Sequence, residues 1–134
     1  NKTWEAMLEC EMVPFKAGIK AGAKMIMTAH IAAPKVTGDE LPATLSPVIL
    51  QDKLRGELGF KGVIVTDAMD MGAITTQFGN AEAAIKSIQA GVDVVLCSRE
   101  FTQVFDAVVK AVEDGEIKET RIDESVKRIL DLKK

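Results

Sequence analysis

Asp67 is the side chain best placed to do chemistry, because it directly follows a short run of strand-forming residues. The run Val63–Thr66 consists of four β-branched residues and is preceded by Gly62. Such a run is typical of a strand buried on both faces in a parallel sheet. Ligands of α/β folds bind at the carboxyl ends of such strands, where the loops converge. We therefore predict a chemical role for the Asp67 carboxylate; the alternative is that Asp67 caps the turn that follows.

His30, the only histidine, follows a second predicted strand, Met25–Thr28. If the strands are parallel, His30 and Asp67 lie at the same mouth of the sheet. Two interpretations of His30 stay open. Either it belongs to the site and forms hydrogen bonds near the Asp67 carboxylate or to a ligand, or its hydrogen bonds are purely structural. Asp70 adds a carboxylate three residues after Asp67, and we interpret it as a loop group that supports the site.

Helices and strands alternate along the chain, which predicts an α/β fold. Ser46-Pro47 is a typical helix start, and Asn80 is predicted to cap the helix that ends near Ala90. Gly59, Gly91 and Gly115 are typical residues after helix ends. A loop of residues 30–46 separates the first strand from the second helix. The predicted strands are 25–28, 63–66 and 92–97, and the predicted helices are 14–21, 47–58, 80–90, 101–113 and a last one from about Arg121 or Asp123 to Leu132.

This order predicts a parallel sheet with right-handed crossovers. Its strands start about 38 and 29 residues apart, which fits the βα repeats of a (β/α)₈ barrel of about 250 residues. Because only three strands are predicted, we interpret residues 1–134 as a single truncated domain. Its two open sheet edges would invite association, so we expect either self-association or exposed apolar surface.

Composition excludes several classes of function. With 47% hydrophobic and 28% charged residues, the chain is an ordinary globular protein, and its net charge of −3 argues against nucleic-acid binding. No apolar run approaches the length of a membrane helix, and no signal-peptide pattern is present. Cys10 and Cys97 lack metal-ligand spacing, and Cys97 is interpreted as a buried thiol. No glycine-rich phosphate-binding motif of the Walker or Rossmann type occurs.

Other charged residues are interpreted as structural. Arg55 and Glu57 are expected to form structural pairs on a helix far from the mouth of the sheet. Asp93 is expected to make hydrogen bonds at the end of an element, and the charges from Arg121 to Lys134 to form a solvated face.

Several stretches together resemble glycoside hydrolase family 3, and most closely its β-N-acetylglucosaminidase branch, which removes terminal GlcNAc from peptidoglycan-derived fragments. The central stretch, Leu54–Ile74, reads Leu-Arg-Gly-Glu-Leu-Gly-Phe-Lys-Gly-Val-Ile-Val-Thr-Asp-Ala-Met-Asp-Met-Gly-Ala-Ile. The similarity also includes Pro-Ala-Thr-Leu-Ser at 42–46, the Met-Thr-Ala-His run that ends at His30, Ala-Gly-Val-Asp at 90–93, and residues 121–130. It covers nearly the whole chain in the family's order.

The resemblance implies the last three strands, sixth to eighth, of a TIM-type barrel, with Asp67 at the end of the seventh. It implies that Asp67 is the catalytic nucleophile of a retaining mechanism, in which a carboxylate attacks an oxocarbenium-like centre. Met71 matches a position that lines the sugar site, although Met69 and Met71 could equally fill the core. His30 is predicted to bind substrate or to support the site.

In this branch the acid/base is a histidine on a mobile loop, and a Lys-His pair binds the sugar. Neither Gly-His-Gly-Asp nor Lys-His-Phe occurs here, so we expect the chain to be inactive alone. Two alternatives stay open. The first is a β-glucosidase or β-xylosidase of the same family, against which Thr66-Asp67-Ala68 counts, since those enzymes carry Ser-Asp-Trp. The second is a non-catalytic half-barrel module for binding or assembly. Bacterial relatives are cytoplasmic or secreted, which leaves the compartment open.

Overall fold

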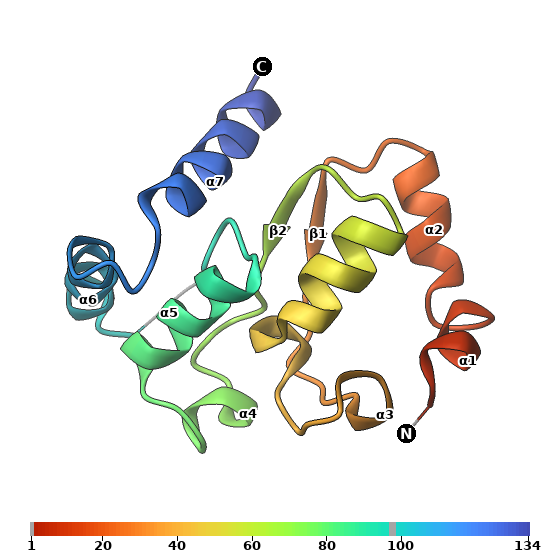
Figure 1. The fold of residues 1–134 in the computed structure, drawn as a ribbon, viewed down its shortest axis with the longest axis horizontal. Coiled ribbons are helices and arrows are strands. Elements are labelled where there is room, and N and C mark those ends of the chain that lie inside the picture. Colours follow the sequence, from red (N-terminus) through yellow and green to blue (C-terminus); the bar gives the residue numbers. More distant parts are fainter. Residues whose placement is uncertain (1, 97–98) are drawn as a thin grey trace.

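The computed structural model describes residues 2–96 and 99–134; Cys97, predicted to be a buried thiol, lies outside them. The helices are small and surround a short sheet (Figure 1). In chain order the elements are α1 (Trp4–Leu8), α2 (Val13–Lys20), β1 (Met25–Met27), α3 (Pro34–Thr37), the 3₁₀ turn η1 (Ala43–Leu45), the π-type helix η2 (Val48–Glu57), β2 (Val63–Val65), α4 (Gly72–Thr75), α5 (Asn80–Ala90), α6 (Phe101–Glu113) and α7 (Glu119–Leu132).

The sheet is parallel, as the alternation of helices and strands predicts. Strand β1 pairs with β2 in the register Met25 to Val63, and both end at the same edge of the sheet. The backbone pairing continues one step beyond the strands, where the Thr28 amide donates to the Val65 carbonyl at 2.9 Å. Strand β2 is buried on both faces, since Val63, Ile64 and Val65 are at most 6% exposed. This burial agrees with its run of β-branched residues.

A third strand was predicted over residues 92–97, and its described part, 92–96, forms a single parallel bridge, between Val94 and Val65. The Asp93 and Val94 amides donate to the Ile64 carbonyl, and side chains supply further hydrogen bonds between this segment and β2. The Ile64 amide, which faces it, donates to the Asp93 carboxylate at 2.9 Å. Farther along, the Leu96 amide donates to the Thr66 hydroxyl at 2.8 Å instead of a backbone carbonyl. The segment runs beside β2 as a third strand would, but without a regular hydrogen-bond ladder.

Two apolar clusters hold the helices against the sheet. The first contains Leu50, Leu54, Phe60, Ile64, Ala90 and Val92. The second lies beyond the carboxyl end of β2 and contains Leu45, Met69, Ile74 and Ala83. Helix α5 contacts η1, η2 and α6, whereas α7 contacts β2. In Figure 1, α6 lies on the other side of α5 from β1, and α7 lies above α5. No helix in the described part of the chain is long and apolar enough to cross a membrane.

Glycines end helices where the sequence predicted, because they adopt the left-handed conformation that follows a helix. Gly59, Gly91 and Gly115 have φ values of +71°, +119° and +78°. The Ser46 hydroxyl also accepts a hydrogen bond from the Ile49 amide at the start of η2, at 3.4 Å. Helix α5 covers the predicted residues, Asn80–Ala90, but the prediction that Asn80 caps it was wrong. Gly79 occupies the cap position of α5, and the Asn80 side chain reaches Glu100 instead.

Gly62 is fixed by a close approach between two backbones. A Cβ atom at this position would collide with the carbonyl of Lys24 and the ring of Phe60. The Val63 amide donates to the same carbonyl at 2.9 Å, so β2 begins where the two chain segments touch. Gly62 therefore sets the position of the strand that leads to Asp67.

Candidate active site

Asp67 lies just beyond the end of β2, at the edge of the sheet where β1 also ends. Its side chain is partly buried, and Oδ1 accepts a hydrogen bond from the Ala68 amide at 2.8 Å. No hydrogen bond joins Oδ2 to another atom within residues 2–96 and 99–134. One carboxylate oxygen is thus oriented by the backbone, and the other is available to a ligand.

The structure brings His30 next to Asp67, as the sequence predicted for a shared mouth. Its Nε2 lies 3.0 Å from the carbonyl oxygen of Ala68, the residue that follows Asp67. Its Nδ1 lies 2.9 Å from the hydroxyl of Thr44. Both ring nitrogens are therefore paired within the protein. A sugar hydroxyl would have to displace one of these partners to bind the ring.

The two methionines after Asp67 differ in position. Met69 is 1% exposed and packs in the second apolar cluster, which supports a core role for it. Met71 is 45% exposed at the start of α4, close in sequence to Asp67 and free to contact a ligand. Asp70 lies between them and forms a long ion pair of 3.6 Å with Arg99.

Threonines are the site residues that the sequence analysis missed. Thr44 and Thr66 are 0% exposed and Thr28 is 9% exposed, and all three make side-chain hydrogen bonds. Thr44 comes from the loop of residues 30–46, which folds into α3 and η1. The long loop was a signal of function, but nothing in its sequence singled out this hydroxyl. Only the folded chain places it between His30 and Thr28.

Asp93 forms a very different cluster, toward the amino ends of the strands. Its carboxylate is completely buried, and it contacts three arginines. The distances are 2.6 Å to Arg55, 3.0 Å to Arg128 and 3.5 Å to Arg121. The Ser125 hydroxyl and the Ile64 amide add hydrogen bonds of 2.7 and 2.9 Å.

This cluster corrects one prediction and confirms another. Arg121 and Arg128 were predicted to belong to a solvated face, but they reach inward and attach α7 to the sheet. Arg55 has the structural partner that was expected. Burial lowers the pKa of the Arg55 guanidinium, while the charge of Asp93 opposes that shift. Glu57 accepts a hydrogen bond from the Trp4 indole at 2.7 Å and pairs with Lys53 at 3.1 Å.

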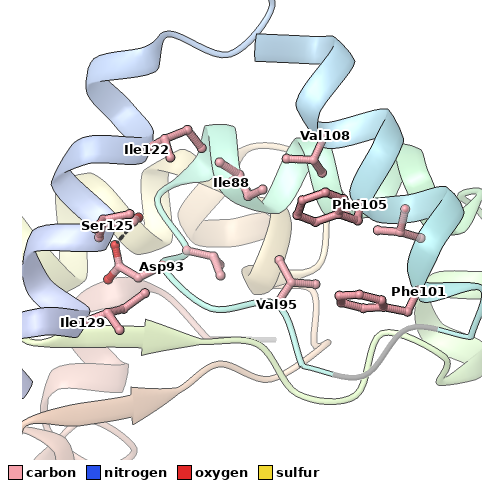
Figure 2. Close-up of a pocket in the computed structure, with 13 residues that line it drawn as sticks. Ile88, Asp93, Val95, Phe101, Phe105, Val108, Ile122, Ser125 and Ile129 are labelled. Carbon is pink, nitrogen blue, oxygen red and sulfur yellow. Dashed lines mark hydrogen bonds between the residues drawn. The ribbon is translucent and has the colours of Figure 1, made fainter. Parts of the chain in front are cut away.

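A hollow of about 480 Å³ lies away from Asp67. It lies between α5, α6 and α7 and is lined almost entirely by apolar side chains (Figure 2). Its polar lining residues, Asp93 and Ser125, are bonded to each other. Because its lining offers no free reactive group, we place the candidate site at Asp67 instead. No group of three or more potential metal ligands occurs among the described residues.

The fold and site define an α/β protein of repeated strand–helix units, with a carboxylate at the carboxyl end of a buried parallel strand. A family model described as "Glycosyl hydrolase family 3 N terminal domain" matches residues 1–132. The chain therefore belongs to glycosyl hydrolase family 3.

Individual relatives agree with this assignment. The chain is 34% identical over 143 residues to "Beta-hexosaminidase A" of Pseudoalteromonas piscicida, covering 92% of this chain and 24% of that protein. It is 33% identical to "Beta-N-acetylglucosaminidase/beta-glucosidase" of Cellulomonas fimi, covering 90% of this chain and 23% of that protein. A family 3 β-N-acetylglucosaminidase from Paenibacillus sp. str. FPU-7 superposes with a TM-score of 0.93 at 42% identity, covering 98% of this chain and 26% of that one. The chain thus spans about a quarter of the length of these relatives.

Proposed function

We propose that residues 1–134 are part of the catalytic domain of a retaining glycosidase that removes terminal β-linked N-acetylglucosamine, as from peptidoglycan fragments. In this proposal the chain supplies strands six to eight of a (β/α)₈ barrel, and Asp67 is the nucleophile. Family membership and the names of the relatives support the class of enzyme. The position of Asp67 at the carboxyl end of β2 is the observation that carries the assignment of the nucleophile.

The geometry of Asp67 suits a double displacement. The Ala68 amide holds Oδ1, which leaves Oδ2 for the incoming sugar. Attack by Oδ2 on the anomeric carbon forms a glycosyl ester and breaks the bond to the leaving oxygen, which needs a proton. Water then cleaves the ester and returns the carboxylate. Neither step requires a metal or an organic cofactor.

In the branch that this chain resembles, a histidine on a mobile loop donates the proton, and we propose that the donor here also lies outside residues 1–134. His30 is the only histidine in the sequence, and both of its nitrogens already have protein partners. We therefore propose that the 134-residue chain is inactive alone. Met71, which is exposed beside the turn, is proposed to contact the sugar.

The test uses a full-length hybrid, in which residues 1–134 replace the matching segment of the Paenibacillus sp. enzyme. The hybrid should hydrolyse a chromogenic β-GlcNAc substrate, and the 134-residue chain should not. Asp67→Ala should abolish hydrolysis, and azide should restore cleavage by attacking the anomeric carbon in place of the carboxylate. A folded hybrid without activity on any glycoside, or an active Asp67→Ala variant, would refute the proposal.

The same assay separates the two alternatives. The Cellulomonas fimi relative carries both enzyme names, so the panel includes β-glucoside and β-xyloside substrates. Faster turnover of either would favour a β-glucosidase or β-xylosidase. Sugar binding without turnover of any substrate would favour a non-catalytic binding or assembly module.

We also propose that the isolated chain self-associates. The outer edge of β1 has no strand partner within the described residues, and Met25 and Met27 beside it are 46% and 51% exposed. Unpaired strand edges with apolar neighbours promote association. Sedimentation of the isolated chain should show dimers or larger species, and Met25→Lys with Met27→Lys should shift it toward monomer. A monomer at all concentrations would contradict this.

A further inference from the structure

We propose that His30 is a positioning residue for Asp67, acting through the backbone of Ala68 rather than by contact with the sugar. This inference rests on the proposed function of Asp67. It is drawn from a continuous chain of hydrogen bonds that links two buried threonines, the His30 ring, Ala68 and the Asp67 carboxylate.

The partner of each ring nitrogen determines the tautomer of His30. A carbonyl oxygen can only accept a hydrogen bond, so the Nε2 that faces Ala68 carries the hydrogen. In the neutral ring, Nδ1 then accepts from the Thr44 hydroxyl. The contact with Ala68 therefore depends on a donor at Nε2, and it persists if the ring becomes protonated.

Buried hydroxyl groups hold the ring from the other side. Thr44 Oγ1 lies 2.8 Å from Thr28 Oγ1 and 3.2 Å from the Ala29 carbonyl. Thr28 follows β1, and Thr44 lies in η1, so the ring is anchored to the sheet and to the next segment. If both ring nitrogens carry hydrogen, Nδ1 donates to Thr44 instead, and the Thr44 hydroxyl can donate to the Ala29 carbonyl. The ring is held by either arrangement.

Ala68 transmits this anchoring to the carboxylate. Its carbonyl accepts from His30 and also from the Met71 amide at 3.2 Å, and its amide donates to Asp67 Oδ1. The carbonyl that His30 contacts and the amide that binds Asp67 lie on either side of the Ala68 α-carbon. Rotation of the Ala68 backbone would therefore turn the amide that orients Oδ1. Displacing a reacting group by about 1 Å can cost on the order of a hundredfold in rate. His30 would prevent that rotation.

The test replaces His30 by glutamine or asparagine, whose side-chain amides can take the place of Nε2 and Nδ1, respectively. In His30→Gln the side-chain amide can still donate to Ala68, whereas in His30→Asn only the position of Nδ1 is reproduced. In the full-length hybrid, His30→Asn should lower kcat about 10- to 100-fold with little change in KM. His30→Gln should recover most of kcat. A rise in KM alone, or equal kcat values for both variants per folded enzyme, would overturn the inference.

A double-mutant cycle distinguishes positioning from sugar contact. If His30 acts only through Asp67, the azide-rescued rate of Asp67→Ala should be unchanged by adding His30→Asn. A further loss of tenfold or more would mean that His30 acts on the sugar itself. Failure of azide rescue together with an active Asp67→Ala variant would instead refute the proposed nucleophile.

Hydrogen exchange on the 134-residue chain gives a readout that needs no activity. The Met71 amide shares the Ala68 carbonyl with His30, so its exchange should accelerate in His30→Asn and remain slow in His30→Gln. Thr44→Val should act like His30→Asn to a smaller extent. Thr102→Val, the same change at an exposed position of α6, is the control. Equal protection of Met71 in both His30 variants would contradict the backbone link.

Discussion

Two carboxylates of this protein follow or flank the same sheet, yet they have opposite surroundings. Asp93 is completely buried and contacts three arginines, a serine and a backbone amide. Asp67 is partly exposed and has one backbone amide as its hydrogen-bond donor. Asp93 uses both oxygens to join segments of the protein, whereas Asp67 keeps one oxygen for a ligand.

The difference shows that a carboxylate before a segment of the sheet can have a structural role, whereas one after a strand can remain available for chemistry. Asp93 lies where the third segment begins, under helix α7, and its partners come from η2 and α7. Asp67 lies where β2 ends and the chain turns, and its side chain is only partly buried. A buried carboxylate is stable only when cations and donors satisfy it, and a carboxylate satisfied in this way cannot attack a substrate.

The largest expected effect is the loss of activity in Asp67→Asn, with little loss of stability. Asp67→Asn in the full-length hybrid should lower kcat by about a thousandfold or more, because the amide is a poor nucleophile. The free energy of unfolding of the 134-residue chain should change by less than about 0.5 kcal/mol, since only one hydrogen bond is affected. Kinetics and urea denaturation measure the two quantities. A large loss of stability would place Asp67 in the same class as Asp93.

Asp93→Asn should show the opposite pattern. Removing this charge leaves three arginines around a neutral side chain, and breaking a buried ion pair typically destabilises a protein by about 3–5 kcal/mol. Urea denaturation of the 134-residue chain measures the loss. Asp106→Asn, the same change at an exposed position of α6, is the control and should be nearly neutral. Equal stability of the two variants would refute a structural role for Asp93.

Gly62→Ala tests the strand that carries Asp67. The added methyl group would meet the Lys24 carbonyl, so β2 would have to shift, at a destabilisation of about 1–3 kcal/mol. Gly72→Ala is the control, because nothing lies within 4 Å of a Cβ atom there and φ is not positive. Thermal unfolding compares the two. If Gly62→Ala were as stable as Gly72→Ala, the close approach would not define the start of β2.

The smallest expected effect is that of Glu57→Gln on the pH dependence of stability, because this carboxylate is more exposed than that of Asp93. The Trp4 indole and the Lys53 ammonium hold its pKa below the ordinary value of 4.5. A lowered folded-state pKa gives stability that is present above the unfolded pKa and is lost as pH falls through the folded pKa. Glu57→Gln should therefore flatten the fall in stability below about pH 4.5. A fall as steep as in the unmodified chain would exclude this linkage.

Local signals predicted much of the fold correctly. The β-branched run at Val63–Thr66 became a buried strand, and glycines followed the helices as expected. These predictions succeeded because strand burial and helix ends depend on residues within a few positions of one another. The Asn80 prediction failed for the converse reason, since its side chain has a partner 20 residues away at Glu100.

By itself, the sequence determined the order of the longer helices and of β1 and β2, the parallel pairing of these strands, and a carboxylate just past the end of β2. The short elements α3, η1 and α4 lie in segments predicted as loops. Tertiary structure alone decided which carboxylate is buried and which is available. It brought Arg55 and Arg128 to Asp93 from 38 and 35 residues away. It also joined His30 to Thr44 and Ala68, 14 and 38 residues away. Contacts over such distances depend on how the helices pack on the sheet, which no local pattern encodes.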